Sequence, residues 1–310
     1  MQSLAGLARW RMTRKLGAGI SGSVYQARDI TGNHPDVAVK VVEKARLSAH
    51  SVRQAHDTPS TCPIHHLSLT RHSSSHLQLA LTRQEAQIMH KFNHPNVVRL
   101  EEFYEMEEFI FLILELCPGG ELSDKIISKR RFDEEAARHI FRQLVNGIEH
   151  IHSKGVAHRW EPLLPLAFEY FRNADFGLRD IKPQNILCVG EDDNLPQVKI
   201  ADFGCSKKFL WRAFSYCGTR SHMAPEVKDG LAYTKKVDMW SLGCTLYNLL
   251  CGGDTSDMAP KIASRWSEFY STRWNGVSLK AMDMVENLVV LDPKKRFGVK
   301  EILHHPWMQE

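Results

Sequence analysis

Four polar side chains between positions 180 and 202 have the types and spacing needed to move a phosphoryl group. Asp180 and Lys182 are separated by one residue, and Asn185 and Asp202 follow them in that order. Phosphoryl transfer depends on positioning and charge stabilisation more than on covalent help from the protein. A carboxylate can accept the proton of an acceptor hydroxyl, a lysine can offset phosphate charge, and amide or carboxylate oxygens suit Mg²⁺. We therefore predict Asp180 and Lys182 as catalytic residues and Asn185 and Asp202 as metal ligands.

A glycine-rich segment near the N-terminus could bring backbone close to the phosphates of a nucleotide. The run from Gly17 to Val24 contains three glycines, and glycine permits such a close approach. The same run also fits an ordinary hairpin, whereas a dinucleotide-binding turn would open a helix and precede an acidic residue by about 20 positions. The alternating run Val37 to Val42 then indicates a β-strand that places Lys40 to reach the phosphates. Glu85, in a helical pattern, is the candidate ion-pair partner of Lys40.

Together these motifs resemble those of eukaryotic-type protein kinases over nearly the whole chain, from Leu16 to Met308. Further motifs of that family are Ala224-Pro225-Glu226, the run Asp238 to Gly243, and Arg296, the family's usual partner for Glu226. Phosphotransferases that act on small molecules share the aspartate and the metal ligands but usually lack these features. The resemblance implies ATP and Mg²⁺ as cofactors. It also implies a set of ATP-binding residues: Leu16, Gly17, Gly19, Gly22, Val24, Ala38, Lys40, Glu85, Leu114, Glu115, Cys117 and Glu121.

The resemblance implies that the acceptor is serine or threonine on a protein substrate. Serine/threonine kinases carry a lysine two residues after the base, as Lys182 does, and a threonine like Thr219. Glu121 matches the acid with which basophilic relatives hold an arginine upstream of the acceptor, through a charge-assisted contact. Such relatives often carry a second acid after the proline of the catalytic loop, and here that position is Gln184. This difference weakens the expected preference for basic substrates. The runs 132–141 and 291–308 resemble the calmodulin-dependent and checkpoint kinase group.

Two positions are predicted as regulatory. Ser215 lies where many relatives carry an activating phosphorylation, and Arg179 or Arg159 could receive that phosphate. The alternative for Ser215 is an ordinary surface serine. Thr219 completes the predicted regulatory set. We also expect no autoinhibitory or calmodulin-binding tail after residue 310, and no phosphopeptide-binding domain at the N-terminus.

The composition is that of a globular protein with a large core. The sequence has 310 residues, of which 43% are hydrophobic, and no run approaches the roughly 18 apolar residues that a membrane span needs. Seven cysteines lack metal-type spacing, so reduced thiols are expected. A net charge of +4 gives no argument for nucleic acid. We expect an intracellular monomer in the cytoplasm or nucleus, with protein substrates and with neither nucleic acid nor membrane as a partner.

The order of the patterns predicts an α+β, two-lobed, protein-kinase-like fold. Strand-like segments fill the first third, with residues 115–117 as a hinge. A helix should begin near Asp133, because apolar residues recur at helical spacing from Ala137 to Ile151. Short strands at Ile186–Val189 and Val198–Ile200 would present the metal ligands. We assign residues 1–116 to a β-rich N-lobe and residues 117–310 to a mainly α-helical C-lobe.

Two predicted insertions depart from the family pattern. Residues 55–83 are rich in Ser, Thr and His with little helical periodicity, and we predict that they are disordered. Histidines and Cys62 in this segment suggest zinc, but their spacing matches no common structural site. The second insertion, residues 160–178, separates His158-Arg159 from Arg179-Asp180 in the predicted catalytic loop.

The second insertion leaves three hypotheses open. The segment could loop out, with Arg179 in place of Arg159 and activity retained. It could displace the base, and a misplacement of about 1 Å can cost about 100-fold in rate, which would leave a pseudokinase that binds nucleotide or partner proteins. It could also be a sequence artefact such as translated intron, because a deletion from one arginine to the other restores contiguous His-Arg-Asp.

Overall fold

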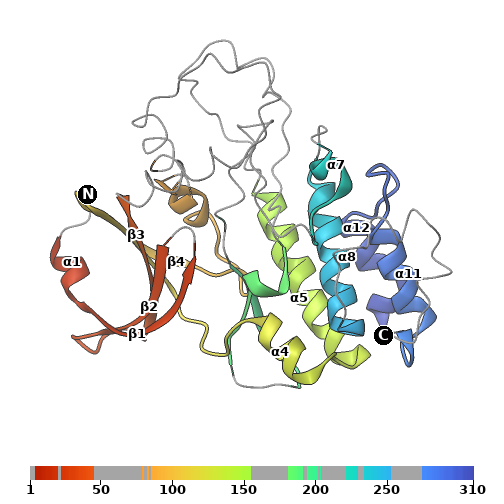
Figure 1. Ribbon diagram of the computed structural model, residues 1–310, viewed down its shortest axis with the longest axis horizontal. Helices are drawn as coiled ribbons and strands as arrows, with labels where there is room; N and C mark the ends of the chain where they lie inside the picture. The colour runs from red at the N-terminus through yellow and green to blue at the C-terminus, as the bar shows by residue number, and fades with distance from the viewer. Residues whose placement is uncertain are drawn as a thin grey trace, which may run out of the picture. The chain divides into compact units, whose positions relative to one another are not determined.

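The described part of the chain forms two compact units. The computed structural model describes residues 4–19, 22–44, 79, 82–83, 85–154, 181–190, 194–201, 203, 221–229, 234–252 and 274–310. One unit comprises Met1–Asn93 and Val98–Leu116, and the other His94–Val97 and Cys117–Glu310. The first is rich in strands and the second mainly helical (Figure 1), which confirms the predicted α+β fold. Among these described residues, no helix combines the length and the apolar character required to cross a membrane.

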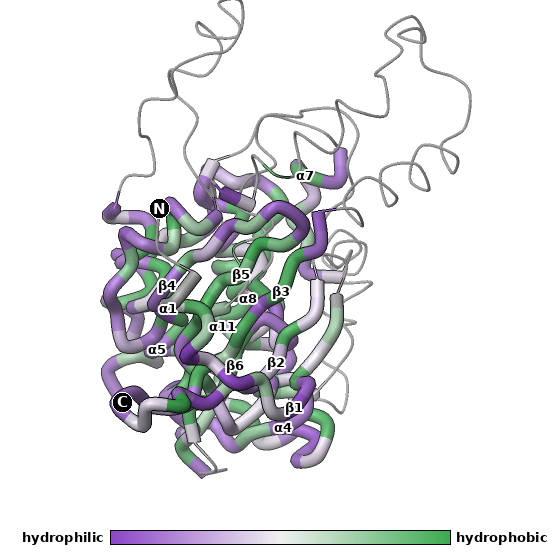
Figure 2. The backbone as a smooth tube through the Cα atoms, turned by 90° about the vertical axis from the view of Figure 1, so that its left-hand side faces the viewer, coloured by the Kyte–Doolittle hydropathy of each residue, from purple (hydrophilic) through white to green (hydrophobic). Residues whose placement is uncertain are grey.

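An antiparallel sheet dominates the described residues of the first unit. Its five strands are ordered β1-β2-β3-β5-β4. Their bounds are β1 Trp10–Gly19, β2 Gly22–Asp29, β3 Val37–Glu43, β4 Leu100–Glu105 and β5 Phe109–Glu115. The central strands β3 and β5 are mainly hydrophobic (Figure 2), as expected for strands paired on both sides.

The two faces of this sheet carry different side chains, because successive residues of a strand point to opposite faces. On one face, α1 (Leu4–Ala8) contributes Leu7 to a cluster with residues of all five strands, namely Trp10, Ala27, Val37, Val39, Tyr104 and Ile113. Lys40 follows Val39 directly, so it belongs to the opposite face. Val24 and Leu112 pair with Lys40 across the sheet and share that face.

A helical segment accompanies the sheet within the first unit. Residues 82–83 and 85–89 are helical, and Thr82 and Glu85 are buried. Thr82 and Arg83 form the end of the segment predicted to be disordered, so the ordered helix begins earlier than the sequence indicated. Burial of Thr82 and an ion pair from Arg83 to Glu105 supply contacts that local periodicity does not reveal. Residues 55–78, including the histidines and Cys62, lie outside the described residues.

The second unit is built from helices and one short hairpin. Its helices are α4 Leu122–Lys129, α5 Glu134–Ser153, α7 Pro225–Lys228, α8 Lys236–Cys251, α11 Leu279–Leu288 and α12 Val299–His304, with 3-10 turns η2 Pro183–Asn185 and η5 Pro306–Gln309. The hairpin pairs β6 Ile186–Cys188 with β7 Val198–Ile200. Asp133 caps α5 by accepting a bond from the Ala136 amide at 2.8 Å, which confirms the predicted start. Residues 237–250 of α8 are buried throughout.

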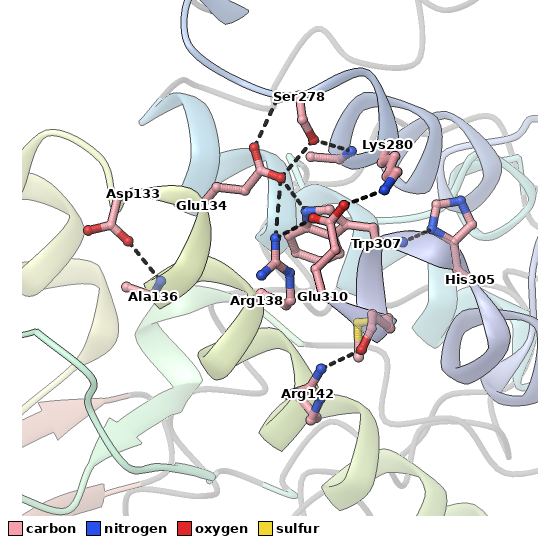
Figure 3. A network of polar contacts seen from close by, with 12 residues as sticks. Asp133, Glu134, Ala136, Arg138, Arg142, Ser278, Lys280, His305, Trp307 and Glu310 are labelled. Carbon is pink, nitrogen blue, oxygen red and sulfur yellow. Dashed lines mark hydrogen bonds and ion pairs between the residues drawn. The ribbon is translucent and has the colours of Figure 1, made fainter.

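A polar network joins the start of α5 to the C-terminal part of this unit (Figure 3). Glu134 accepts bonds from the Ser278 hydroxyl (2.7 Å), the Ser278 amide (2.9 Å) and the Trp307 indole (2.7 Å). Arg138 donates to Glu310 at 2.9 Å, and its guanidinium lies 5.3 Å from the Trp307 ring centroid. The network therefore fixes the N-terminal turns of α5 against α11 and η5.

Candidate functional site

The glycine-rich run is a β-hairpin. The β1–β2 register extends to the pair Gly19 and Gly22, so the run does not open a helix. Gly22 has φ +141°, and a Cβ atom there would lie 2.2 Å from the Val41 carbonyl oxygen, so folding requires glycine. A Cβ atom at Gly17 would meet no described atom within 4 Å. Packing against the described residues therefore does not demand glycine at this position, and a ligand could approach its backbone from the described side.

Lys40 and Glu85 form an ion pair in the first unit. Lys40 Nζ lies 3.1 Å from Glu85 Oε1, and the side chains are 13% and 5% exposed. The strand register places Ala38 opposite Leu114 and Lys40 opposite Val24. These four sheet residues share one face, because paired residues and residues two apart point the same way. The ion pair that the sequence predicted is therefore present beside small and apolar side chains.

Two other first-unit residues predicted to contact ATP lie at an irregularity of one strand and at the end of another. Leu16 sits at a register shift of β1, between Lys15 and Gly17, and is 40% exposed. Glu115 is the last residue of β5, and its amide donates to the Arg99 carbonyl at 3.0 Å. An exposed leucine next to open glycine backbone provides apolar surface that a base or sugar can cover.

In the second unit, the segment that carries Glu121 is attached to β6. The Gly119 amide donates to the Cys188 carbonyl at 3.0 Å, and the Cys188 amide donates to the Gly120 carbonyl at 2.8 Å. Glu121 then forms a bridge with Leu187 and occupies the N-cap position of α4, where its side chain makes no capping hydrogen bond. Its Oε2 accepts a bond from the Ser123 hydroxyl at 2.8 Å. Glu121 is exposed, and Cys117, earlier in the same segment, is half-buried.

Backbone pairing places Asn185, a predicted metal ligand, beside Ala201 at one end of the β6–β7 hairpin. Asn185 ends η2, where its amide donates to the Lys182 carbonyl at 2.9 Å. Ile186 pairs with Ile200, and the Ala201 amide donates to the Asn185 carbonyl at 2.8 Å. Asp202 is the next residue along the chain. Asp202 itself lies outside the described residues, so a cation shared by Asn185 and Asp202 stays a prediction.

Four predicted functional residues lie outside the described residues: Asp180, Asp202, Ser215 and Thr219. The predicted insertion 160–178 lies outside them as well. Ile181, which follows Asp180, is buried, and its carbonyl accepts a bond from the Thr245 hydroxyl at 3.4 Å. The chain is therefore tied to α8 one residue after the predicted base.

Asn96 and Gln143 support the β6–β7 hairpin and were missed by sequence reasoning. Asn96 Nδ2 donates to Gln143 Oε1 at 3.1 Å and to the Val198 carbonyl at 3.0 Å. Gln143 Oε1 also accepts from the Val198 amide at 2.9 Å. Both residues are buried, and their polar atoms bond to each other and to the backbone of Val198 in β7, as buried polar groups normally require. The available signal was a glutamine on the otherwise apolar face of α5.

The chain matches known proteins over most of its length. The family model described as the protein kinase domain matches residues 10–160 and 164–308. A probable myosin light chain kinase of Dictyostelium discoideum is 35% identical over 235 residues, which cover 73% of this chain and 55% of that protein. The calcium/calmodulin-dependent protein kinase type II of Schizosaccharomyces pombe is 31% identical over 322 residues, 98% of this chain and 58% of that protein. The calcium/calmodulin-dependent protein kinase type IV of Mus musculus is 37% identical over 238 residues, which cover 74% of this chain and 46% of that protein. The chain spans about half the length of these curated relatives.

Proposed function

The chain belongs to the protein kinase family, as a calmodulin-dependent-kinase-like serine/threonine member, and from this premise we propose that it transfers the γ-phosphate of ATP to serine or threonine side chains of proteins. ATP and Mg²⁺ are the cofactors of this family. The observation that carries the proposal is the Lys40–Glu85 ion pair at 3.1 Å. Such a pair is one of the parts that must be in place for phosphoryl transfer in protein kinases.

The first unit would bind the nucleotide phosphates. Glu85 holds the Lys40 ammonium on the sheet face that also carries Val24 and Ala38, so the cation is oriented before ATP arrives. The backbone at Gly17 could approach the phosphates because no described side chain occupies that space. Orientation in advance matters because preorganised charges require little rearrangement as phosphate charge develops.

The second unit would supply the base and the metal ligands. Asn185 and Asp202 would offer the oxygen donors that Mg²⁺ prefers, and the bond from the Ala201 amide to the Asn185 carbonyl, one residue before Asp202, supports this assignment. When bound, Mg²⁺ neutralises charge on the β- and γ-phosphates. Asp180 would accept the proton of the acceptor hydroxyl while that oxygen bonds to the γ-phosphorus. The bond from phosphorus to the β–γ bridging oxygen breaks, ADP leaves, and Lys182 offsets charge on the transferred group.

We further propose a preference for a basic residue upstream of the acceptor. Glu121 is exposed, and Ser123 donates a bond to its Oε2, which leaves acceptor capacity on the carboxylate for a guanidinium. The test compares two serine peptides that differ only by Arg or Ala at the upstream position. Glu121→Gln should reduce the preference for the arginine peptide about 10-fold, the effect of roughly one charge-assisted bond. Asp124→Asn, on the exposed face of α4, is the matched control, and equal effects of the two variants would refute the assignment.

The alternative function is a pseudokinase. The sequence itself motivates it, because residues 160–178 separate His158-Arg159 from Asp180. A chain of this kind would bind nucleotide but fail to transfer phosphate. A third account, in which the insertion is absent from the mature protein, is tested by peptide mass spectrometry. A tryptic fragment that lies within residues 160–172 would eliminate it.

Transfer of labelled γ-phosphate to a basic serine peptide tests the main proposal. We expect the wild-type chain to label the peptide and Asp180→Asn to lower the rate by about 100-fold or more, the usual contribution of a general base. Signal that survives the substitution would not come from this site. Thermal stabilisation by Mg²⁺ and ATP without peptide labelling would instead support the pseudokinase.

A further inference from the structure

Glu105, at the end of β4, bridges the two elements that carry Lys40 and Glu85. Its Oε1 accepts from Lys44 Nζ at 2.8 Å and from a terminal nitrogen of Arg83 at 2.7 Å. Its Oε2 accepts from Arg83 Nε at 2.7 Å. Lys44 directly follows β3, the strand of Lys40, and Arg83 lies two residues before Glu85 in the helical segment. A single carboxylate thus links the end of β3 to the beginning of that segment.

The strand register places Glu105 on the same sheet face as Lys40. Glu105 pairs with Ile110 across β4 and β5, and Ile110 pairs with Val42 across β5 and β3. Paired residues point the same way, and Val42 and Lys40 are two residues apart on one strand. The Glu105 bridge and the Lys40–Glu85 pair therefore act on the same side of the sheet.

We propose that Glu105 is a positioning residue for phosphoryl transfer, because it holds the helical segment where Glu85 can pair with Lys40. This inference rests on the proposed function. Residues two apart on a helix point in different directions, about 200° apart around its axis. Arg83 and Glu85 therefore hold the helical segment from two sides of its axis, and a rotation of the helix that breaks one ion pair strains the other. The Arg83–Glu105 contact thus limits the rotation of the helix that the Lys40–Glu85 pair alone would permit.

The chemistry of the bridge suits a permanent anchor. Arg83 binds the carboxylate through two nitrogens, a geometry that fixes direction as well as distance. The hydrogen bonds from Arg83, assisted by the one from Lys44, lower the pKa of Glu105 to about 2 against the opposing effect of burial. Glu105 is therefore ionised throughout the physiological pH range.

Solvent limits the strength of the bridge. The Arg83 side chain is 50% exposed and that of Glu105 is 23% exposed, so water and salt screen part of the attraction. We therefore expect a partial loss of activity when the bridge is broken. The loss should appear in kcat/KM for ATP, because Lys40, whose orientation changes, is the residue proposed to bind the ATP phosphates.

Steady-state kinetics of Glu105→Gln test the proposal. We expect kcat/KM for ATP to fall about 3- to 10-fold, equivalent to about 0.6–1.4 kcal/mol, while KM for the peptide is unchanged. Glu107→Gln, in the exposed turn after β4, is the matched control and should match the wild type. A variant that only lost folded protein would show a lower kcat with an unchanged KM for ATP, and that result would overturn the positioning role.

A charge exchange supplies the rescue. Arg83→Glu and Glu105→Arg each place like charges together, whereas the double variant restores an opposite-charge pair at the same positions. We expect kcat/KM for ATP in the double variant to exceed that of both single variants by at least about 3-fold, a coupling of the size found for contacting charged residues. A double variant no better than the single ones would contradict a direct Arg83–Glu105 contribution.

Hydrogen exchange separates this inference from the proposed function. Amide exchange of residues 85–89 can be measured whether or not the chain transfers phosphate. We expect faster exchange of these amides in Glu105→Gln and no change in Glu107→Gln, because local opening depends on the contacts that hold the segment. Unchanged exchange would refute the anchor. If the wild type shows no transfer but Glu105→Gln still speeds exchange, the proposed function fails and the anchor stands.

Discussion

Arg296 and Glu226 form a buried ion pair joined by two hydrogen bonds. One terminal nitrogen of Arg296 donates to Glu226 Oε1 at 2.7 Å and the other to Oε2 at 3.1 Å. The arginine side chain is 0% exposed and the glutamate 6%. Arg296 also donates to the Val290 and Lys236 carbonyls. The pair that the sequence indicated is thus embedded in backbone contacts that bring the α7 segment and the residues before α12 together.

Removal of one side chain of the Arg296–Glu226 pair should strongly destabilise the protein. Glu226→Ala leaves the Arg296 guanidinium buried without its carboxylate, and we expect the free energy of unfolding to fall by about 3–5 kcal/mol. Urea denaturation measures this loss. Asp229→Ala, one turn later and exposed, is the control and should change stability by less than about 0.5 kcal/mol. Equal losses in the two variants would show that the buried pair contributes nothing specific.

Glu134 should give a pH-dependent contribution to stability. Burial raises its pKa, but the bonds from Ser278 and Trp307, with the charge of Arg138, outweigh burial and hold the pKa below its ordinary value of 4.5. A carboxyl whose pKa is lowered on folding stabilises the protein above its unfolded pKa and loses that effect as pH falls through the folded value. We expect Glu134→Gln to cost about 1–3 kcal/mol at pH 7.

The difference between wild type and Glu134→Gln should therefore shrink as pH drops below about 4.5. Denaturation curves at pH 7, 5 and 4 provide the measurement. Glu135→Gln is the neighbouring control, since Glu135 is exposed on the first turn of α5. A constant difference at all three pH values would mean that the carboxylate charge of Glu134 is not what stabilises the network.

Short-range sequence patterns were sufficient to predict the start of α5 and the strands β6 and β7. The start of α5 could be predicted because Asp133 is a good N-cap and apolar residues recur after it. The β6–β7 strands were predicted as short apolar runs around an acidic turn. The Lys40–Glu85 partnership came from resemblance to the kinase pattern, since no local rule connects residues that are 45 positions apart.

The parts that sequence reasoning missed depend on contacts between distant segments. Glu105 looks like any glutamate at a strand end, and only the register shows that it faces the helix of Glu85. Asn96 and Gln143 are 47 positions apart and act through the backbone of β7. Side chains of this kind are ordinary by type, so their roles follow from tertiary structure alone. The roles of Asp180 and Asp202 stay predictions.

Asn185 should affect magnesium use while leaving the fold intact. Asn185→Ala removes the amide oxygen but retains the carbonyl that accepts the Ala201 bond. We expect the Mg²⁺ concentration for half-maximal activity to rise about 10-fold or more, an effect of the size seen when groups that hold a metal are changed, with little change in melting temperature. Gln184→Ala, the exposed neighbour in η2, is the control. An unchanged Mg²⁺ requirement would remove Asn185 from the metal-ligand set.

Gly22 and Gly17 should respond differently to the same substitution. At Gly22, alanine meets both an unfavourable φ of +141° and the Val41 carbonyl, which is backbone and cannot move aside cheaply. We expect Gly22→Ala to cost more than about 1 kcal/mol of stability. At Gly17, the added methyl group meets no described atom within 4 Å, so stability should change by less than about 0.5 kcal/mol.

The same pair of variants also tests nucleotide binding. A methyl group at Gly17 would occupy space that the proposal assigns to ATP, so KM for ATP should rise several-fold while thermal unfolding without nucleotide matches the wild type. Gly22→Ala should instead lower the unfolding temperature before any nucleotide is added. If Gly17→Ala leaves KM for ATP unchanged, the open backbone at position 17 does not face the phosphates, and the hairpin's role in binding must be carried by other residues.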